Sequence, residues 1–117
     1  MNIRELRVGN IVNDDEVVWS ILFNDRIEVS YDSPKKGNAS AYIDIDKVKP
    51  IRITGKRLMS FGFTKNDDEF SLSTFEIVRN VNDWVAYNND VFAAKVKYIH
   101  QLQNLYFALT NKELIHK

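Results

Sequence analysis

The chain has 117 residues, with 16 basic and 16 acidic side chains and no cysteine. This length allows one modest hydrophobic core and excludes two large domains. A formal net charge of zero removes the long-range positive field with which nucleic-acid-binding proteins usually attract phosphates. The absence of cysteine excludes disulfides, thiol catalysis and the usual structural zinc sites. The composition therefore predicts a single soluble domain and is compatible with a reducing cytoplasm.

The sequence carries no sign of a signal peptide or a membrane helix. Its first ten residues contain no apolar core segment. The longest apolar stretch, Val17 to Phe23, is far shorter than the roughly 20 residues that cross a bilayer. We therefore expect no association with membranes.

The first half of the chain is expected to form short strands separated by turn residues. The clearest signal is the alternation of apolar and polar residues from Arg26 to Tyr31. Residues 32–40, with a proline, two lysines and a glycine, are expected to form a mobile loop. Short strands at this spacing are typical of a small SH3-like β-barrel. The expected strands are Val8–Val12, Val17–Phe23, Arg26–Tyr31, Ala41–Val48 and a last one at Ile51–Ile53.

The second half changes to a helical period. Thr54 can cap a short helix that runs through Leu58 to Phe61, and Gly62 can end it in the left-handed conformation. A three-stranded antiparallel meander is expected after this helix. Its strands are predicted at Phe70–Val78, with an irregularity near Thr74 and Phe75, at Trp84–Tyr87 and at Val91–Lys95.

The most regular pattern lies at the end of the chain. From Val96 to Leu109 there is no glycine or proline, and the apolar residues fall within an arc of about 120°. Asn111 is a plausible left-handed cap, and residues 112–117 are expected to fray. The predicted buried arc holds Tyr98, Ile99, Leu102, Leu105, Tyr106 and Leu109, and the predicted polar side holds Lys97, His100, Gln101, Asn104 and Ala108.

These elements together predict an α+β fold in a single domain. Residues 1–53 form a barrel-like β subdomain, and residues 54–117 form an αβββα portion. In this second portion the helix and the three-stranded meander are followed by the amphipathic C-terminal helix, which packs across the meander.

Acidic residues recur in two segments with the same sequence, Asn-Asp-Asp-Glu, at residues 13–16 and 66–69. Neither segment has the glycine and the distal glutamate of an EF-hand loop, so both are interpreted as turns. Asp44 and Asp46 share one predicted strand face, which leaves a small hydrolase or a metal-dependent enzyme as the least favoured alternative. Because the chain lacks a nucleophile elbow and a multi-histidine site, we predict no catalytic residue, cofactor or metal.

A second alternative is a nucleic-acid-associated SH3-like barrel protein. Lys35 and Lys36 can contact a phosphate backbone while Tyr31 and Tyr42, on the flanking strands, stack on bases. The zero net charge and the small size of this patch favour a solvated loop instead.

The leading hypothesis is a non-enzymatic protein-binding or adaptor module. Lys97, His100, Asn104 and Phe107 project from neighbouring positions on the predicted polar face of the last helix. An aromatic ring beside hydrogen-bonding side chains has the composition of an interface centre. The sequence therefore predicts a protein partner or self-association at this patch, while Phe107 can alternatively pack under the meander.

Both ends of the chain resemble a known group of proteins. The run YIHQLQNLYFALTNKEL, Tyr98 to Leu114, resembles the ending of small uncharacterised proteins carried by phages and prophages of gut bacteria. Their openings are similar to ELRVGNIV, within Ile3 to Val12, and their middle is similar to Ile51–Phe63. Asn111 stands where a glycine is expected in that group. The resemblance implies a mobile-element origin, in the cytoplasm of a bacterial host, and implies no activity.

Overall fold

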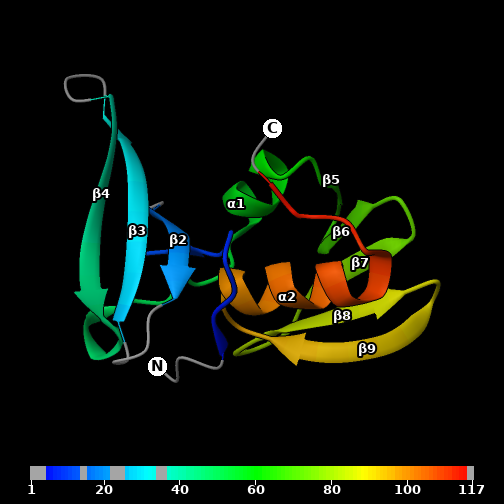
Figure 1. Cartoon of the computed structure of the whole chain (residues 1–117). Coiled ribbons are helices and arrows are strands. Elements are labelled where there is room, and N and C mark those ends of the chain that lie inside the picture. The colour runs from blue at the N-terminus through cyan, green and yellow to red at the C-terminus, as the bar shows by residue number, and fades with distance from the viewer. Residues whose placement is uncertain (1–4, 14–15, 22–25, 34–36, 116–117) are drawn as a thin grey trace. The chain divides into compact units, whose positions relative to one another are not determined.

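The structure is a computed structural model that describes residues 5–13, 16–21, 26–33 and 37–115. The chain divides into two units, Met1–Ile51 and Arg52–Lys117, and each unit contains its own antiparallel sheet (Figure 1). The α-helices α1 and α2 both belong to the second unit. The predicted α+β class is confirmed, and the predicted boundary after residue 53 lies close to the division between the units.

The N-terminal unit is built on a four-stranded antiparallel sheet in the order β1-β2-β3-β4. Each strand pairs with the next strand along the chain, so the sheet is a simple meander. The strands are β1 (Ile11–Val12), β2 (Glu16–Ile21), β3 (Arg26–Ser33) and β4 (Gly37–Asp44), and the 3₁₀-helix η2 (Ile45–Lys47) follows them.

The described strands of this unit do not form the expected SH3-like barrel. Strands β1 and β4 are the two edges of an open sheet. The fifth strand expected at Ile51–Ile53 does not join them, because Arg52 instead forms an isolated bridge with Tyr98 in the C-terminal unit. Strand spacing predicted the hairpins correctly, but closure of a barrel depends on pairing between distant strands, which spacing does not reveal.

A tight turn at Arg7–Asn10 shortens the first predicted strand. The Asn10 amide donates to the Arg7 carbonyl at 3.0 Å, and the Asn10 Oδ1 accepts from the Arg7 amide at 2.6 Å. Gly9 has a φ of 100°, which the third position of a type II turn requires. Only Ile11 and Val12 therefore remain of the strand expected at Val8–Val12.

The hairpin of β3 and β4 extends further than predicted. Its register runs from Arg26 opposite Asp44 to Ser33 opposite Gly37, so most of the loop expected at residues 32–40 is strand. Only residues 34–36 of that loop lie outside the described residues. A backbone ladder can continue through polar residues, which leave no alternating hydrophobic signal in the sequence.

The core of the N-terminal unit is aliphatic. Ile27 is fully buried on β3 and the next residue, Glu28, is only partly buried, as the predicted alternation requires. Ile43 and Ile45 pack against the core and are partly buried. The buried cluster consists of Leu6, Val12, Val18, Ile27 and Val48.

The C-terminal unit opens with α1 (Gly55–Ser60), whose two ends match the prediction. The Thr54 Oγ1 caps the helix by accepting from the Arg57 amide at 3.2 Å. At the other end, Gly62 has a φ of 97° and donates its amide to Met59, while the Phe63 amide donates to the Leu58 carbonyl at 3.1 Å. This pair of bonds is a Schellman motif, in which the left-handed residue is usually glycine.

The following sheet is a meander of five strands, in the order β5-β6-β7-β8-β9, and not of three. The strand expected at Phe70–Val78 is split by a turn in which Ser73 has a φ of 58°. A further strand precedes it and has only exposed residues, so it leaves no hydrophobic pattern. The strands are β5 (Thr64–Asn66), β6 (Glu69–Leu72), β7 (Phe75–Arg79), β8 (Trp84–Asn88) and β9 (Val91–Val96).

The last helix, α2 (Ile99–Thr110), starts later than the predicted Val96, which belongs to β9, and ends as predicted. At its start the Gln101 Oε1 accepts from the amides of Lys97, at 2.9 Å, and of Tyr98, at 3.2 Å. At its end Asn111 adopts the predicted left-handed conformation, with a φ of 58°. The prediction of fraying is wrong at Leu114, which is buried and whose carbonyl accepts from the Gln103 Nε2.

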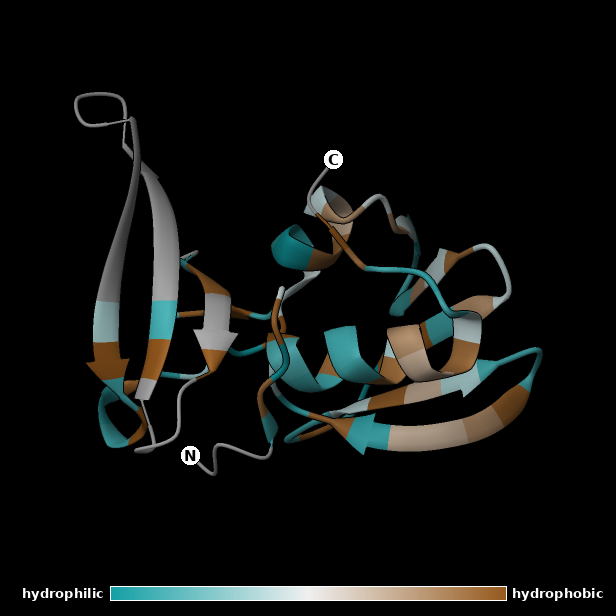
Figure 2. Ribbon diagram, viewed as in Figure 1, coloured by the Kyte–Doolittle hydropathy of each residue, from teal (hydrophilic) through white to brown (hydrophobic). Residues whose placement is uncertain are grey.

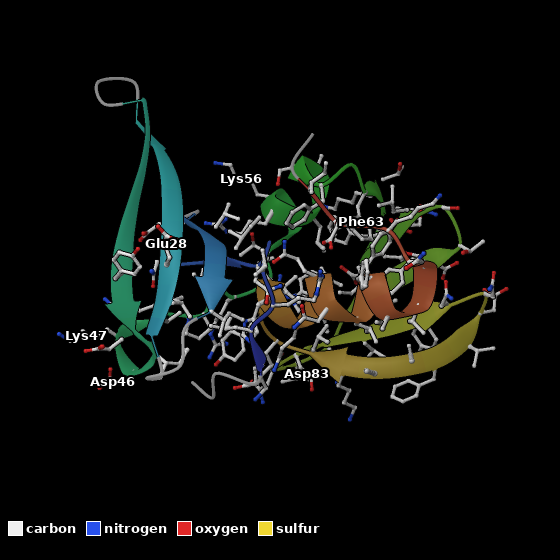
Figure 3. All side chains as sticks on the ribbon, viewed as in Figure 1. Glu28, Asp46, Lys47, Lys56, Phe63 and Asp83 are labelled. Carbon is white, nitrogen blue, oxygen red and sulfur yellow. The ribbon has the colours of Figure 1, made fainter. Side chains whose placement is uncertain are left out.

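Helix α2 lies across one face of the five-stranded sheet (Figure 1). Phe75 is fully buried at this contact, with its ring centre 5.3 Å from that of Tyr106 and 6.3 Å from that of Phe63, which Figure 3 labels. The Phe70 and Trp84 rings form a further edge-to-face pair at 5.7 Å. This aromatic layer is the core of the C-terminal unit. No helix among the described residues is long and apolar enough to span a membrane.

Candidate functional site

The predicted interaction patch on the last helix is not one exposed surface. His100 is only 1% exposed, and its ring stacks on Tyr98 with 5.9 Å between ring centres and 13° between ring planes. Asn104 and Phe107 are partly buried. Lys97 is exposed but precedes the helix. The prediction that His100 lies on the surface is therefore wrong.

The physical reason is a rotation of the buried face of α2. Leu109, predicted to be buried, is 41% exposed, whereas Gln103 is 1% exposed. At 100° per residue the centre of the buried arc lies roughly 80° from its predicted position, toward His100 and Gln103. The hydrophobic pattern gave no reason to place Gln103 on the buried face, because glutamine is polar. Its amide can be buried because it donates to the Leu114 carbonyl at 3.2 Å.

The predicted nucleic-acid patch falls mostly on residues that the structure does not place. Lys35 and Lys36, and the side chain of Tyr31, lie outside the described residues. Tyr42 lies on β4 and is 64% exposed. This alternative stays a prediction, and salt-dependent binding of an oligonucleotide would test it.

The acidic residues considered for catalysis do not form a pair on one strand. Strand β4 ends at Asp44, and Asp46 lies in η2, where it is exposed (Figure 3). In the second acidic segment Asp67 has a φ of 57°, which confirms the interpretation of that segment as a turn. Within the described ranges, no group of three or more histidine, aspartate or glutamate residues is placed to hold a metal ion.

The structure reveals a surface that the sequence analysis missed, on the face of the meander opposite α2. Val78 pairs with Val85, and Tyr87 pairs with Phe92, whose ring centre lies 6.2 Å from that of Tyr87. The first three side chains are partly buried, and Phe92 is 57% exposed. These four residues, Val78, Val85, Tyr87 and Phe92, form the outer-face patch.

Charged residues of opposite sign flank the outer-face patch on two different strands. On β7, Glu76 pairs with Tyr87 of β8, and on β9, Lys95 pairs with Val85 of β8. Figure 2 shows β9 as a largely hydrophobic strand with a hydrophilic band near its carboxyl end. The patch therefore has a negative side and a positive side.

A signal for this patch is present in the sequence of β8. The run Trp84-Val85-Ala86-Tyr87 is apolar at every position, although Trp84 and Ala86 alone face the core. A strand with one solvated face normally alternates apolar and polar residues. The unbroken apolar run thus indicates that the second face of β8 is apolar as well.

Comparison of the chain with protein-family models, with curated proteins and with solved structures finds no match. The functional assignment therefore rests on the residues and the geometry described above.

Proposed function

We propose that the protein is a non-enzymatic binding module that self-associates through the outer-face patch. The observation that carries this proposal is the aromatic pair of Tyr87 and Phe92 on the open face of the meander. Aromatic residues are enriched at the centres of protein interfaces, where burial of their rings supplies most of the binding energy. The partner proposed for this face is a second copy of the chain.

The flanking charges support a second copy as the partner. Glu76 on β7 and Lys95 on β9 lie on opposite sides of β8. Glu76 lies level with Tyr87 and Lys95 level with Val85, two residues apart along β8. If a two-fold axis crosses β8 near Ala86 at an angle to the strand, each Glu76 lies opposite Lys95 of the other copy, so the face is complementary to itself. A partner of a single charge would leave one of these two residues opposed by a like charge or by none.

The size of the face indicates a weak association. Strands lie about 4.8 Å apart and advance about 3.4 Å per residue, so these short strands offer a few hundred Å² per copy. Stable complexes bury about 800 Å² on each partner. We therefore expect a dimer that forms and dissociates as the protein concentration changes.

Sedimentation velocity of the wild-type chain across a wide range of concentrations tests the proposal. The weight-average mass is expected to rise with concentration for the wild type and to stay at the monomer value for Phe92→Ser. Leu109→Ser is the matched control, because Leu109 is an exposed apolar residue on α2, away from the patch. A wild type that stays monomeric throughout, or a Phe92→Ser variant that still associates, would overturn the proposal.

A charge exchange tests the two-fold arrangement. Glu76→Lys and Lys95→Glu are each expected to weaken association, since each places like charges together. The double variant is expected to restore it, because the two charges are merely exchanged. A double variant as weak as the single variants would contradict this two-fold arrangement.

The origin of the chain in a phage or prophage, and its location in the host cytoplasm, belong to the same proposal. They rest on the resemblance of Glu5–Val12 and Tyr98–Leu114 to phage-carried proteins. Neighbouring genes of phage type would support this origin.

A further inference from the structure

Basic residues from three separate segments meet at one end of the five-stranded sheet. Arg79 pairs with Trp84 at the β7–β8 turn, and Trp84 pairs in turn with Val96 at the end of β9. The Ile53 amide donates to the Lys97 carbonyl at 3.0 Å, which holds residues 52–54 beside the chain that leaves β9. A pocket of about 220 Å³ lies where residues 52–54, residues 79–84 and Lys97 come together.

The lining of this pocket is strongly positive. Arg52, Arg79 and Lys97 line it, and all three side chains are exposed. The lining contains one carboxylate, that of Asp83, whose Oδ1 accepts from the Asn80 Nδ2 at 3.0 Å and so belongs to the turn between β7 and β8. Figure 3 labels Asp83 in this turn. The pocket therefore has an excess of positive charge in a chain whose total charge is zero.

A second, smaller pocket of about 110 Å³ adjoins the first, and one of the three cationic side chains lines both pockets. Arg79 and Trp84 line both pockets, and Asp67 and Asp68 line only the smaller one. Arg79 therefore shares its positive charge between the larger pocket and the two carboxylates of the smaller one. Arg52 and Lys97 line only the larger pocket, where Asp83 is the one carboxylate of the lining, so we take these two residues as its main cationic contacts.

We infer that the larger pocket binds a compact phosphate-type anion, such as a small phosphate monoester. A guanidinium group can donate two parallel hydrogen bonds to two oxygens of a phosphate, and a lysine ammonium adds a point charge on a flexible side chain. The volume lies below the roughly 300 Å³ at which pockets for drug-sized ligands begin, which suits a small anion. This site is independent of the outer-face patch and of the self-association proposed for it.

The pocket suits a free phosphate ester better than a nucleic acid. Trp84 is the aromatic residue of the lining, but it is 8% exposed and its ring packs edge-to-face on Phe70. Stacking on a base requires an accessible ring face. The balanced charge of the chain also fails to provide the extended positive surface along which a nucleic-acid backbone would lie.

NMR titration of the full chain with glycerol phosphate tests the inference, with sodium chloride at matched ionic strength as the reference. Saturable changes are expected in the amide signals of residues 52–54, 79–84 and 97. Arg52→Gln and Lys97→Gln are each expected to weaken binding about tenfold, through loss of a charge-assisted contact. Lys112→Gln removes an exposed lysine elsewhere in the same unit and is expected to leave the affinity unchanged.

The amide spectra of the variants also show whether each one is folded, so loss of binding can be separated from loss of structure. Non-saturating changes, changes spread over the whole unit, or equal affinities of the wild type and both glutamine variants would overturn the inference. Binding of a single-stranded oligonucleotide at these amides, without binding of glycerol phosphate, would also overturn it, because the ligand would then be a nucleic acid.

Discussion

The two units differ in the kind of side chain that fills their cores. Both contain an antiparallel meander, but the N-terminal core is a small aliphatic cluster around Val18 and Ile27. The C-terminal core is a layer of rings around Phe75, covered on one side by α2. Each aromatic ring buries more surface than an aliphatic side chain, so a single position carries more of the stability in the second unit.

This difference also explains where candidate sites occur. The inner face of the C-terminal sheet is filled by its own helix, so the residues left on the outer face, such as Phe92, are available to another molecule. The same compact layer holds the strand ends in place, and Arg52, Arg79 and Lys97 meet there. A rigid core thus positions both candidate surfaces of the unit.

The largest expected effect follows from truncating the aromatic core. Phe75→Ala should lower the free energy of unfolding of the C-terminal unit by about 3–5 kcal/mol, and Ile27→Ala should lower that of the N-terminal unit by about 2–5 kcal/mol. Native-state hydrogen exchange measures each unit separately. Each variant is expected to accelerate exchange mainly in its own unit. Equal acceleration in both units would show that the two cores unfold together, which would break the comparison.

The second prediction concerns the rotated face of α2. Leu102 is fully buried, so Leu102→Ala should cost about 2–5 kcal/mol, whereas Leu109→Ala, at an exposed position of the same helix, should cost less than about 1 kcal/mol. Urea denaturation of both variants measures the difference. A similar loss of unfolding free energy at the two positions would contradict the rotated face and support the buried arc predicted from the sequence.

Local chemistry could be predicted from the sequence, and long-range pairing could not. The caps at Thr54, Gly62 and Asn111 depend on the properties of single residues, and all three are confirmed. The prediction of a barrel was wrong because Arg52 pairs with Tyr98, which lies far along the chain. No pattern in the sequence around either residue indicates that the two pair. Burial of Gln103 was missed for the same reason, since its partner Leu114 follows the helix.

The candidate sites show the same limit. Lys97 was identified from the sequence as a binding residue, but it was grouped with His100 by helical spacing, whereas the structure places it beside Arg52. The apolar run of β8 contained a signal for the outer-face patch, yet the pairing of Tyr87 with Phe92 depends on a shift in register after Ala86. Such a shift is a β-bulge or similar irregularity, which hydrophobic alternation does not predict.

A smaller effect is expected at two glycines with positive φ, one in the type II turn of the N-terminal unit and one at the end of α1. Gly9 has a φ of 100° and Gly62 a φ of 97°, and a side chain at either position is strained. Gly9→Ala and Gly62→Ala should each cost about 1–2 kcal/mol, and the corresponding asparagine variants should cost less, because asparagine tolerates this region better. Thermal unfolding measures the four variants. An alanine variant as stable as the wild type would show that its turn can change conformation without loss.

The smallest expected effect is that of calcium on the two acidic segments, one in each unit. In the first, the Asn13 Oδ1 already accepts from the Lys49 amide at 2.7 Å, and the Asn13 amide donates to the Lys49 carbonyl, so this side chain is committed to joining two parts of the backbone. In the second, Asp67 lies in a tight turn with its neighbours exposed to water.

A cation present well above its dissociation constant would raise the melting temperature, because it would stabilise only the folded state. We therefore expect calcium added after chelator treatment to leave the melting temperature unchanged. A rise of several degrees that Asp68→Asn abolishes would instead assign a cation site to the β5–β6 turn, and that unit would then differ from its neighbour in chemistry as well as in packing.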